Sequence, residues 1–418
     1  MNSPIPITRC RACGNSELAD VLSLGRQTLT GVFPKSKTQE VLAGPLDLVR
    51  CLPGGHETCG LLQMRHSYPQ AAMYGDNYGY RSGLNSSMVL HLHETVARLL
   101  AMAQPAEGSL VCDIGCNDGT LLKAYPESLR RIGIDPVARK FLSFYPDAIQ
   151  VATEFFSAAT WETLAGKAKA AIITSIAMFY DLENPLQFVR EVADCLAPDG
   201  LWHFEQSYMP LMVRRLAYDT ICHEHVEYYA LRQIVWLLKR AELKIVRLEP
   251  SDVNGGSLAV TAAHVSSVHP EASEQIDRLL GEERAAGYET MEPFRDFAKR
   301  VFEHRRRLLE RIEQIRTSGR QLMGYGASTK GNVLLQFCGL GPDQLPFIAE
   351  VNEEKFGCYT PGTGIPIISE AAMHAMHPDV LLVLPWHFRS NLIEREKDFL
   401  AGGGRLLFPL PEIELYPA

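Results

Sequence analysis

The stretch Val111-Cys-Asp-Ile-Gly115-Cys-Asn-Asp-Gly119 decides the fold. It begins as a short apolar strand and ends at glycines that open a helix, which is how open α/β sheets form a nucleoside-binding turn. Twenty-two residues after Asp113, another apolar segment ends in Asp135, whose carboxylate can accept hydrogen bonds from ribose hydroxyls. The turn and Asp135 together predict an adenosyl nucleoside site, whereas the turn alone is equally typical of a strand–helix junction without a ligand.

The glycine spacing favours one cofactor over another. Dinucleotide folds use G-x-G-x-x-G to accommodate a pyrophosphate, but this chain has D-x-G-x-x-x-G, which resembles the first motif of class I S-adenosylmethionine methyltransferases. The resemblance places Phe155 and Phe156 at the adenine, and Ser175 at the fourth strand end, near the methyl group. The cofactor-binding residues expected on this basis are Asp113, Gly115, Asn117, Asp118, Gly119, Asp135, Pro136, Phe155, Phe156 and Ser175.

Apolar strands alternate with helices on both sides of this turn. A helical pattern over residues 84–103 precedes strand-like segments at 109–114, 131–134, 170–176 and 201–205. A charge-dense amphipathic stretch, residues 271–318, separates them from a second set at 321–325, 347–350, 380–384 and 405–408. The alternation in the first set predicts an open parallel α/β sheet, and the second set is a second alternation of the same kind.

Four of the ten cysteines lie near the N-terminus: Cys10, Cys13, Cys51 and Cys59. This pattern is typical of a split zinc site, in which two pairs of thiolates (knuckles) bind one zinc ion. The bound zinc stabilises a domain that is too small to form a sufficient hydrophobic core. The second knuckle is stretched and contains His56, so the ligands could be four thiolates, or three thiolates with His56 in place of Cys51. Four protein ligands favour a structural zinc, with reduced, metal-free cysteines as the alternative.

Composition excludes several other classes of protein. The 418 residues carry a net charge of −8 and are 46% apolar, without a basic tract for nucleic acid. No uninterrupted apolar run reaches membrane-spanning length, and the N-terminal MNSPIPITRC lacks the basic start and apolar core of a signal peptide. We therefore expect a cytoplasmic, multidomain protein with no nucleic-acid or membrane partner.

The densest polar segment is Asp219-Thr-Ile-Cys222-His-Glu-His225-Val-Glu227. It follows a strand end of the first sheet, where open α/β sheets bind ligands. A histidine is the natural proton acceptor near neutral pH, and Glu224 can tune or orient His225. A metal site at His223 and His225 is less favoured because no third ligand is near. Exposed loop residues without chemistry are the other alternative.

Six motifs occur in one order along the chain: C-x-x-C…C-G-L-L-Q, Tyr78-Gly-Tyr80-Arg-Ser82, Asp113-Ile-Gly-Cys-Asn-Asp-Gly119, His223-Glu-His225, Asn254-Gly-Gly-Ser257 and Tyr325-Gly-Ala-Ser-Thr-Lys330-Gly-Asn332. Together they resemble the nucleotide-sugar C-methyltransferases that add branching methyl groups to deoxysugars, as in the mycarose and tetronitrose pathways. The resemblance covers essentially the whole chain. It implies an α/β protein with a zinc-binding N-terminal domain (1–75), a class I methyltransferase domain (76–265), a helical connector (266–318) and a second Rossmann-like C-terminal domain (319–418).

The resemblance also implies a reaction, in which methyl from S-adenosylmethionine is transferred to C-3 of a nucleoside-diphosphate 4-keto-6-deoxysugar through an enolate. The sugar would lie between the last two domains and become a branched-chain deoxysugar. The residues expected to act on it are the base His225, its partner Glu224, the hydroxyls of Tyr78 or Tyr80, and Lys330. Analogy favours a monomer.

Two departures from the family leave the general acid open. Cys222 stands where many relatives have tyrosine, and Asp181 where many have histidine, so both join the candidate catalytic residues. An O- or N-methyltransferase with the same cofactor is the main alternative. A binding scaffold without turnover is disfavoured by Glu224 and His225. A dinucleotide site at Gly326, with Glu350 as the ribose acceptor, is less favoured than a fold-stabilising turn.

Overall fold

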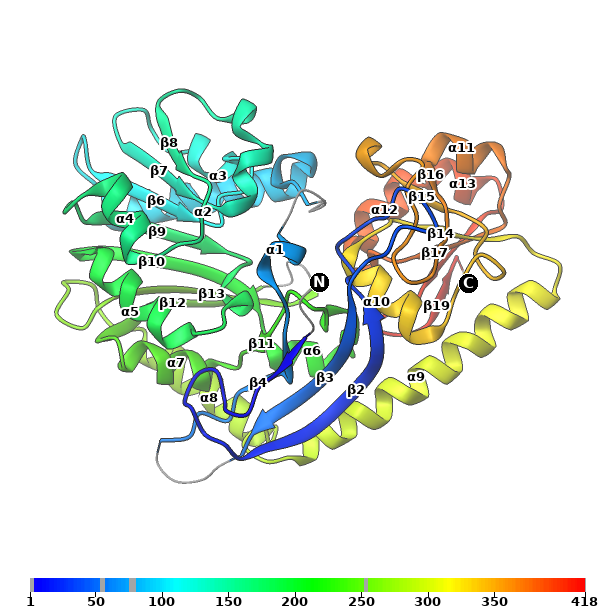
Figure 1. Ribbon diagram of the computed structural model, residues 1–418, viewed down its shortest axis with the longest axis horizontal. Helices are drawn as coiled ribbons and strands as arrows, with labels where there is room; N and C mark the ends of the chain where they lie inside the picture. Colours follow the sequence, from blue (N-terminus) through cyan, green and yellow to red (C-terminus); the bar gives the residue numbers. More distant parts are fainter. Residues whose placement is uncertain (1–3, 53–56, 75–79, 252–254, 418) are drawn as a thin grey trace.

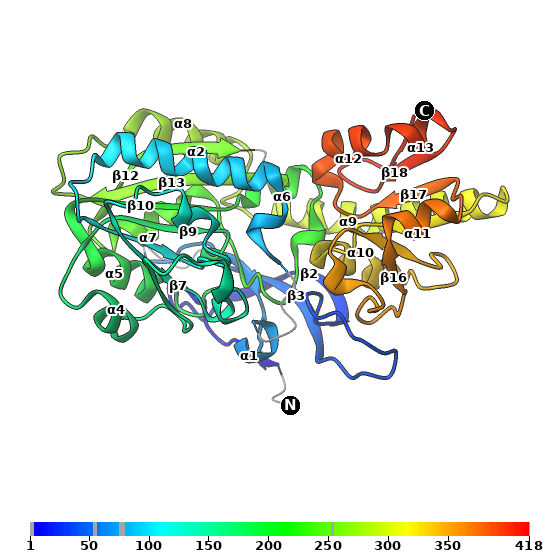
Figure 2. The ribbon, with the colours of Figure 1, turned by 90° about the horizontal axis from the view of Figure 1, so that it is seen from above.

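The computed structural model describes residues 4–52, 57–74, 80–251 and 255–417. Two α/β lobes stand side by side, and a pair of long curved strands from the N-terminal region passes between them (Figures 1 and 2). The predicted α/β fold class is confirmed. The predicted division of the chain at residues 75, 265 and 318 stays a prediction.

The larger lobe contains a seven-stranded sheet of order β12-β13-β10-β9-β6-β7-β8. Its strands are β6 (Leu110–Ile114), β7 (Arg130–Ile134), β8 (Ile149–Ala152), β9 (Ala170–Ile176), β10 (Leu196–Ser207), β12 (Leu243–Ser251) and β13 (Ser257–His264). The five strands from β6 to β10 run parallel to their neighbours, whereas β13 pairs antiparallel with both β10 and β12. The associated helices are α2 (Ser86–Ala103), α3 (Thr120–Lys123), α4 (Ala158–Ala165), α5 (Pro185–Cys195), α6 (Met209–Arg214) and α7 (Leu231–Lys239).

The smaller lobe contains a six-stranded sheet of order β16-β15-β14-β17-β18-β19. Its strands are β14 (Leu322–Tyr325), β15 (Ile348–Glu350), β16 (Ile367–Ser369), β17 (Val380–Val383), β18 (Arg405–Phe408) and β19 (Glu414–Tyr416), and its helices are α10 (Thr329–Cys338), α11 (Glu370–Ala375), α12 (Arg389–Arg395) and α13 (Lys397–Ala401). Strands such as β17, Val-Leu-Leu-Val, are fully buried, as expected for parallel strands covered on both faces.

Two helices connect the lobes, α8 (Ser273–Ala285) and α9 (Glu292–Thr317). The 26 residues of α9 extend for about 39 Å, and the helix reaches from beneath the larger lobe to the smaller one (Figure 1). One stripe of α9 is buried: Phe294, Phe297, Val301, Leu308, Ile312 and Ile315. The predicted amphipathic connector is therefore helical, with a break between α8 and α9.

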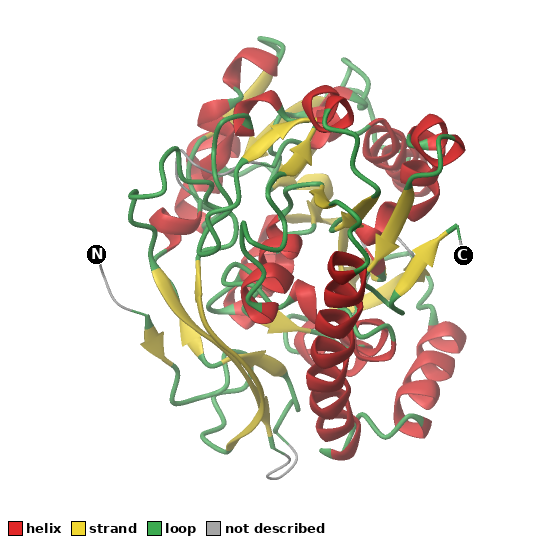
Figure 3. Cartoon of the chain, turned by 90° about the vertical axis from the view of Figure 1, so that its right-hand side faces the viewer, coloured by secondary structure: helices red, strands yellow, loops and turns green. Residues whose placement is uncertain are grey.

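The N-terminal region contributes three strands to a four-stranded antiparallel sheet of order β11-β4-β3-β2, whose fourth strand comes from residues 227–228. Its strands are β2 (Leu18–Thr28), β3 (Ala43–Cys51), β4 (Leu62–Met64) and β11 (Glu227–Tyr228), with β1 (Ile5–Pro6), β5 (His66–Ser67) and α1 (Gln70–Met73) beside it. Figure 3 shows the two long strands of this sheet curving together in yellow. Register shifts break the β2–β3 ladder twice, which disrupts the period-two pattern by which such strands are predicted from sequence.

Candidate functional site

A cavity of about 420 Å³ opens at the carboxyl ends of the parallel strands of the larger lobe. Its volume is in the range of small-molecule sites. All three parts of the chain line it: Gly31 comes from the N-terminal region, Asp113 and His225 from the larger lobe, and Lys330 and His387 from the smaller lobe. Strand ends of this kind of sheet are where the fold binds ligands, so this cavity is the candidate active site.

The glycine turn forms one end of the cavity. Gly115 and Asn117 have positive φ angles of 80° and 49°, which turn the chain sharply after β6. The carboxylate of Asp135 accepts hydrogen bonds from the backbone N–H groups of Asn117 and Val137, both at 2.7 Å. A carboxylate has about four acceptor positions, so these two bonds leave acceptor capacity for a ribose hydroxyl. Phe155, which is 44% exposed although large and apolar, offers its ring to an adenine in the same cavity.

Asp113 is buried at the end of β6, and its carboxylate accepts a hydrogen bond from the hydroxyl of Thr174 at 2.6 Å. Burial raises the pKa of Asp113 to about 7. An acidic group held in this way can pair with the ammonium end of an amino-acid cofactor, because a nearby cation favours its ionised form.

The acidic and amide side chains of the turn also hold the cavity rim. Asn117 accepts from the N–H of Ser82 at 2.9 Å and donates to the carbonyl of Tyr80 at 3.2 Å. Asp118 accepts from the N–H of Gly83 at 3.0 Å. These bonds fix the rim segment 80–83 against the turn.

Most of the predicted site residues lie together on the cavity wall: Asp113, Gly115, Asn117, Asp135, Pro136, Phe155, Phe156, Tyr80, Asp181, Glu224, His225 and Lys330. Asp118, Gly119, Ser175 and Cys222 do not line it. Ser175 lies inside the sheet, where its hydroxyl accepts from the indole N–H of Trp202 at 2.9 Å. Cys222 is fully buried next to the wall. Tyr78 is outside the described residues.

His225 has the geometry of a base. Its Nδ1–H donates to the carbonyl oxygen of Thr220 at 2.8 Å, which leaves Nε2 as the unprotonated acceptor. Burial, and then the positive charge of Lys330, lower the pKa of His225 to about 4. The imidazole is therefore neutral, and able to take a proton, across the physiological range.

Two carboxyl groups lie on the same cavity wall as His225. Burial raises the pKa of Glu224, and it raises the pKa of Asp181 well above its ordinary value. Within the part of the chain that the structure describes, one oxygen of each has no hydrogen-bond partner, Oε2 of Glu224 and Oδ1 of Asp181. Both groups can therefore hold a proton and donate it to an oxygen of a bound molecule.

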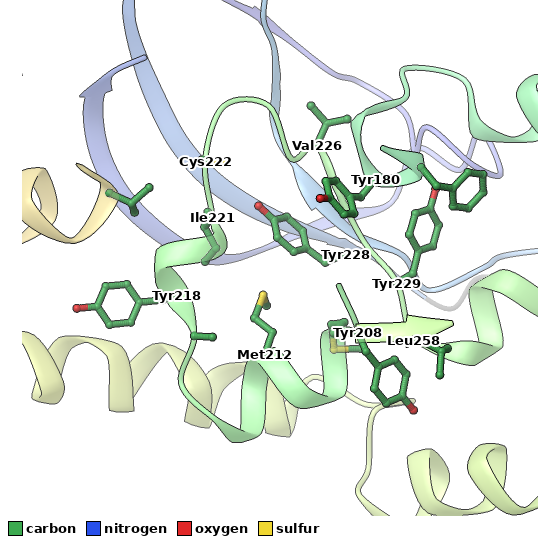
Figure 4. Packing of buried hydrophobic residues seen from close by; sticks show 14 of the residues in the cluster. Tyr180, Tyr208, Met212, Tyr218, Ile221, Cys222, Val226, Tyr228, Tyr229 and Leu258 are labelled. Atoms are coloured by element: carbon green, nitrogen blue, oxygen red, sulfur yellow. The ribbon is translucent and has the colours of Figure 1, made fainter. Parts of the chain in front are cut away.

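A buried aromatic layer supports the segment that carries His225 (Figure 4). The ring of Tyr180 meets the His225 ring edge-on at 4.4 Å, and the ring of Tyr229 stacks on Phe179 at 5.1 Å. The hydroxyl of Tyr218 lies 3.1 Å from Nδ1 of His304 on α9. These contacts fix both ends of the segment, so His225 is held in one orientation.

Sequence reasoning missed the contribution of three residues. His387 follows β17 and lines the cavity, and burial lowers its pKa well below the ordinary value. Asp219 accepts from the indole N–H of Trp386 at 2.7 Å and balances the nearby Lys330. Gly31 reaches the cavity from the loop between β2 and β3. His387 could have been found from the sequence, because a histidine just after a predicted strand end is a candidate site residue. Nothing in the sequence around Gly31 indicates that it lines the cavity.

The four N-terminal cysteines come together as a metal site. Their sulfur atoms all lie within 4.8 Å of one another, with Sγ of Cys10 at 3.5 Å from that of Cys59, and Sγ of Cys13 at 3.6 Å from that of Cys51. A tetrahedral zinc with bonds of about 2.3 Å sets its sulfurs about 3.8 Å apart, so the thiolates fit this ion. His56, the alternative ligand, lies outside the described residues.

Glu350 differs from Asp135 in that a lysine lies next to its carboxylate. Its carboxylate accepts from the N–H groups of Val351 at 2.8 Å and Asn352 at 3.1 Å, and lies 3.5 Å from Nζ of Lys355. Lys355 in turn donates to the carbonyl of Ala327 at 2.8 Å. These contacts favour the fold-stabilising interpretation of the glycine turn after β14.

In the described parts of the chain, no helix combines the length and apolar character needed to span a membrane.

Family models match three consecutive stretches of the chain: a zinc binding domain over residues 10–74, a methyltransferase domain over 88–248, and a C-methyltransferase C-terminal domain over 252–411. The C-methyltransferase NovU of Streptomyces niveus is 32% identical over 415 residues, which are 97% of this chain and 96% of that protein.

Among solved structures, the N-methyltransferase NodS from Bradyrhizobium japonicum WM9 is 17% identical, with 43% of this chain and 98% of that chain covered at a TM-score of 0.32. The YcgJ protein from Bacillus subtilis is 16% identical, with 41% and 98% covered at a TM-score of 0.32. The family predicted from the ordered motifs is confirmed by the family models and NovU, as are the S-adenosylmethionine cofactor and the zinc. Because its relative NovU matches it from end to end, the chain belongs to the S-adenosylmethionine-dependent C-methyltransferase family.

Proposed function

We propose that this C-methyltransferase acts on C-3 of a nucleoside-diphosphate 4-keto-6-deoxysugar. One observation carries the proposal: the neutral imidazole of His225 faces the cavity that also holds the nucleoside-binding turn and Lys330. Methylation of carbon needs such a base, because a carbon becomes nucleophilic only after a proton beside a carbonyl is removed.

The chain's own side chains have separate tasks in this reaction. Nε2 of His225 takes the proton from C-3, and the electron pair of that C–H bond moves to the neighbouring carbonyl, which becomes an enolate. Lys330, or a protonated Asp181 or Glu224, donates a hydrogen bond to the enolate oxygen and lowers the barrier. S-adenosylmethionine, when bound, supplies an electrophilic methyl group. The C-3 carbon gains that methyl, the electrons of the broken carbon–sulfur bond stay on the sulfur, and His225 releases its proton to solvent.

Residues at the carboxyl ends of β6, β7 and β8 would hold the cofactor. Asp135 has acceptor positions for the ribose hydroxyls, Asp113 would pair with the ammonium group, and Phe155 and Phe156 would offer their rings to the adenine. The predicted methyl-proximal role of Ser175 is not part of this proposal, since its hydroxyl is engaged by Trp202.

Solvent exchange tests the substrate and the position. The protein is incubated in heavy water with methyl-labelled S-adenosylmethionine and a thymidine diphosphate 4-keto-6-deoxysugar. We expect deuterium at C-3 when S-adenosylhomocysteine replaces the methyl donor, and labelled methyl on C-3 when the donor is present, both read by NMR. Label on oxygen or nitrogen, or no C-3 exchange, would contradict the proposal.

The pH dependence of kcat/KM tests the base. His225 works only when neutral, so activity should fall on the acid side near pH 4, where its lowered pKa lies. The charge of Lys330 contributes to that lowering, so Lys330→Met should move the acid limb to higher pH while also reducing the rate. Lys299→Met, at an exposed position on α9, is the matched control and should leave the limb in place. An acid limb that does not move in Lys330→Met would argue against His225 as the titrating base.

A further inference from the structure

We define the zinc-binding module as the described residues 4–52 and 57–74. We infer that this module positions the acid–base segment 222–228 and helix α10, and so forms a functional wall of the substrate site. A structural zinc would ordinarily be expected to stabilise only its own small domain. The inference rests on the proposed function in one respect, which is that Glu224 and His225 act on the substrate.

The acid–base segment is part of the module's sheet. Two residues after His225 the chain enters β11, which pairs antiparallel with β4 through Glu227 opposite Gln63 and Tyr228 opposite Leu62. The N–H of Met64 also donates to the carbonyl of Val226 at 2.8 Å. The module therefore holds the segment immediately after His225 through backbone hydrogen bonds.

The same segment is also attached before Glu224, through His223. Nε2–H of His223 donates to the carbonyl oxygen of Gln27 on β2 at 3.2 Å, and the ring meets Tyr68 edge-on at 4.7 Å. Burial lowers the pKa of His223 to about 4, so the ring is neutral and needs no counter-charge. Glu224 and His225 thus lie between two attachments to the module, His223 on one side and β11 on the other.

Gly31, in the loop that joins β2 to β3, touches both sides of the cavity. A Cβ built on Gly31 would lie 2.6 Å from Oε1 of Glu224 and 3.7 Å from Oγ1 of Thr329 at the start of α10. The backbone of Gly31 also opposes the rise in the pKa of Glu224 through a hydrogen bond. A side chain at position 31 would therefore displace the carboxylate of Glu224.

The end of the β2–β3 hairpin, next to Gly31, is hydrogen-bonded to side chains of α10. The side chain of Gln336 accepts from the N–H of Thr28 at 2.7 Å and donates to its carbonyl at 3.0 Å, as a neighbouring strand would. Asn332 donates to the carbonyl of Thr30 at 2.8 Å. Because α10 begins with Thr329 and Lys330, the module sets where Lys330 lies relative to His225.

The cysteines secure the other end of the same two strands. Cys51 is the last residue of β3, and Cys10 and Cys13 precede β2, whose eleven residues extend for about 36 Å. Loss of the metal would release the sheet in which β11 is the fourth strand. The metal is thus remote from the substrate, yet coupled to the residues that act on it.

Hydrogen exchange of the full chain tests this coupling without a substrate. After chelation of the metal, verified by metal analysis, we expect amides in 222–228 and 329–338 to exchange at least tenfold faster, while those of β6 and β7 keep their protection. Unchanged protection of 222–228 in metal-free protein would overturn the inference.

Two variants that keep the metal make the test independent of unfolding. Gly31→Ala should lower kcat ten- to a hundredfold, because displacement of a catalytic group by about 1 Å can cost that much, with zinc content and S-adenosylhomocysteine affinity unchanged within twofold. Gly281→Ala, where an added Cβ meets nothing within 4 Å, is the control. His223→Ala should also lower kcat, and His223→Gln, which can again donate to Gln27, should recover part of it.

His225→Ala separates the two proposals. If Gly31→Ala and His223→Ala keep full kcat while His225→Ala is inactive, the positioning inference is wrong and the proposed function stands. If His225→Ala is itself fully active, the proposed acid–base chemistry fails, and the exchange experiment still decides whether the module holds segment 222–228.

Discussion

Replacement of His225 by alanine is expected to lower kcat by about 10²–10⁴-fold, the range that a positioned general base contributes. Exchange of the C-3 proton in heavy water should slow by the same factor as methyl transfer, since both begin with removal of that proton. Steady-state methylation and NMR exchange rates measure the two effects.

The matched control is His93→Ala, at an exposed position on α2. It should leave both rates within twofold of the unaltered enzyme. S-adenosylhomocysteine affinity should be unchanged in His225→Ala, because Asp135 and the glycine turn do not depend on the imidazole. A variant that methylates at the full rate would remove His225 from the mechanism.

Replacement of Cys59 by serine is expected to be the most destabilising single change in the N-terminal region. Structural zinc contributes about 10–16 kcal/mol in small zinc domains, and a hydroxyl is a poor substitute for a thiolate on this ion. Cys59 is buried at 1% exposure among the other three sulfurs, so the serine oxygen would also be left without a partner. Metal content and thermal unfolding measure the effect.

Cys358→Ser provides the comparison, because Cys358 is also buried but lies outside the cluster, with its Sγ 3.8 Å from the carbonyl oxygen of Glu354. It should keep one zinc per chain and lose little stability. Full zinc content in Cys59→Ser would contradict a four-thiolate site.

The pattern of apolar residues along the sequence predicts the strands of the two α/β sheets well, and individual strands show the reason. The segment expected at 109–114 is β6 (Leu110–Ile114), and the one expected at 170–176 is β9 (Ala170–Ile176). Such strands are continuous apolar runs between turns, so their boundaries are marked in the chain itself. The long strand β2 (Leu18–Thr28) has no such mark, because it is not a continuous apolar run and register shifts break its alternation of buried and exposed residues.

Side-chain direction limits what could be said of the site. Ser175 was expected near the methyl group because it lies near a strand end, but its hydroxyl points into the sheet toward Trp202. Neighbouring residues of a strand face opposite sides, so a family motif locates a strand end more securely than it locates a given side chain. His225 and Glu224 were found because their chemistry is concentrated in one short segment. Gly31 acts only through contacts that form when distant segments meet.

The hydrogen bonds between Thr28 and Gln336 join residues 308 positions apart, which has a consequence for synthesis on the ribosome. The ribosome adds about 5–20 residues per second, so the β2–β3 hairpin exists for roughly 15–60 s before its partner helix α10 is made. During the first part of that interval, before β11 is made, the edge of β4 is also open, and exposed edges of this kind promote wrong pairing. Early capture of zinc by the four cysteines would keep the nascent strands in register until both partners emerge.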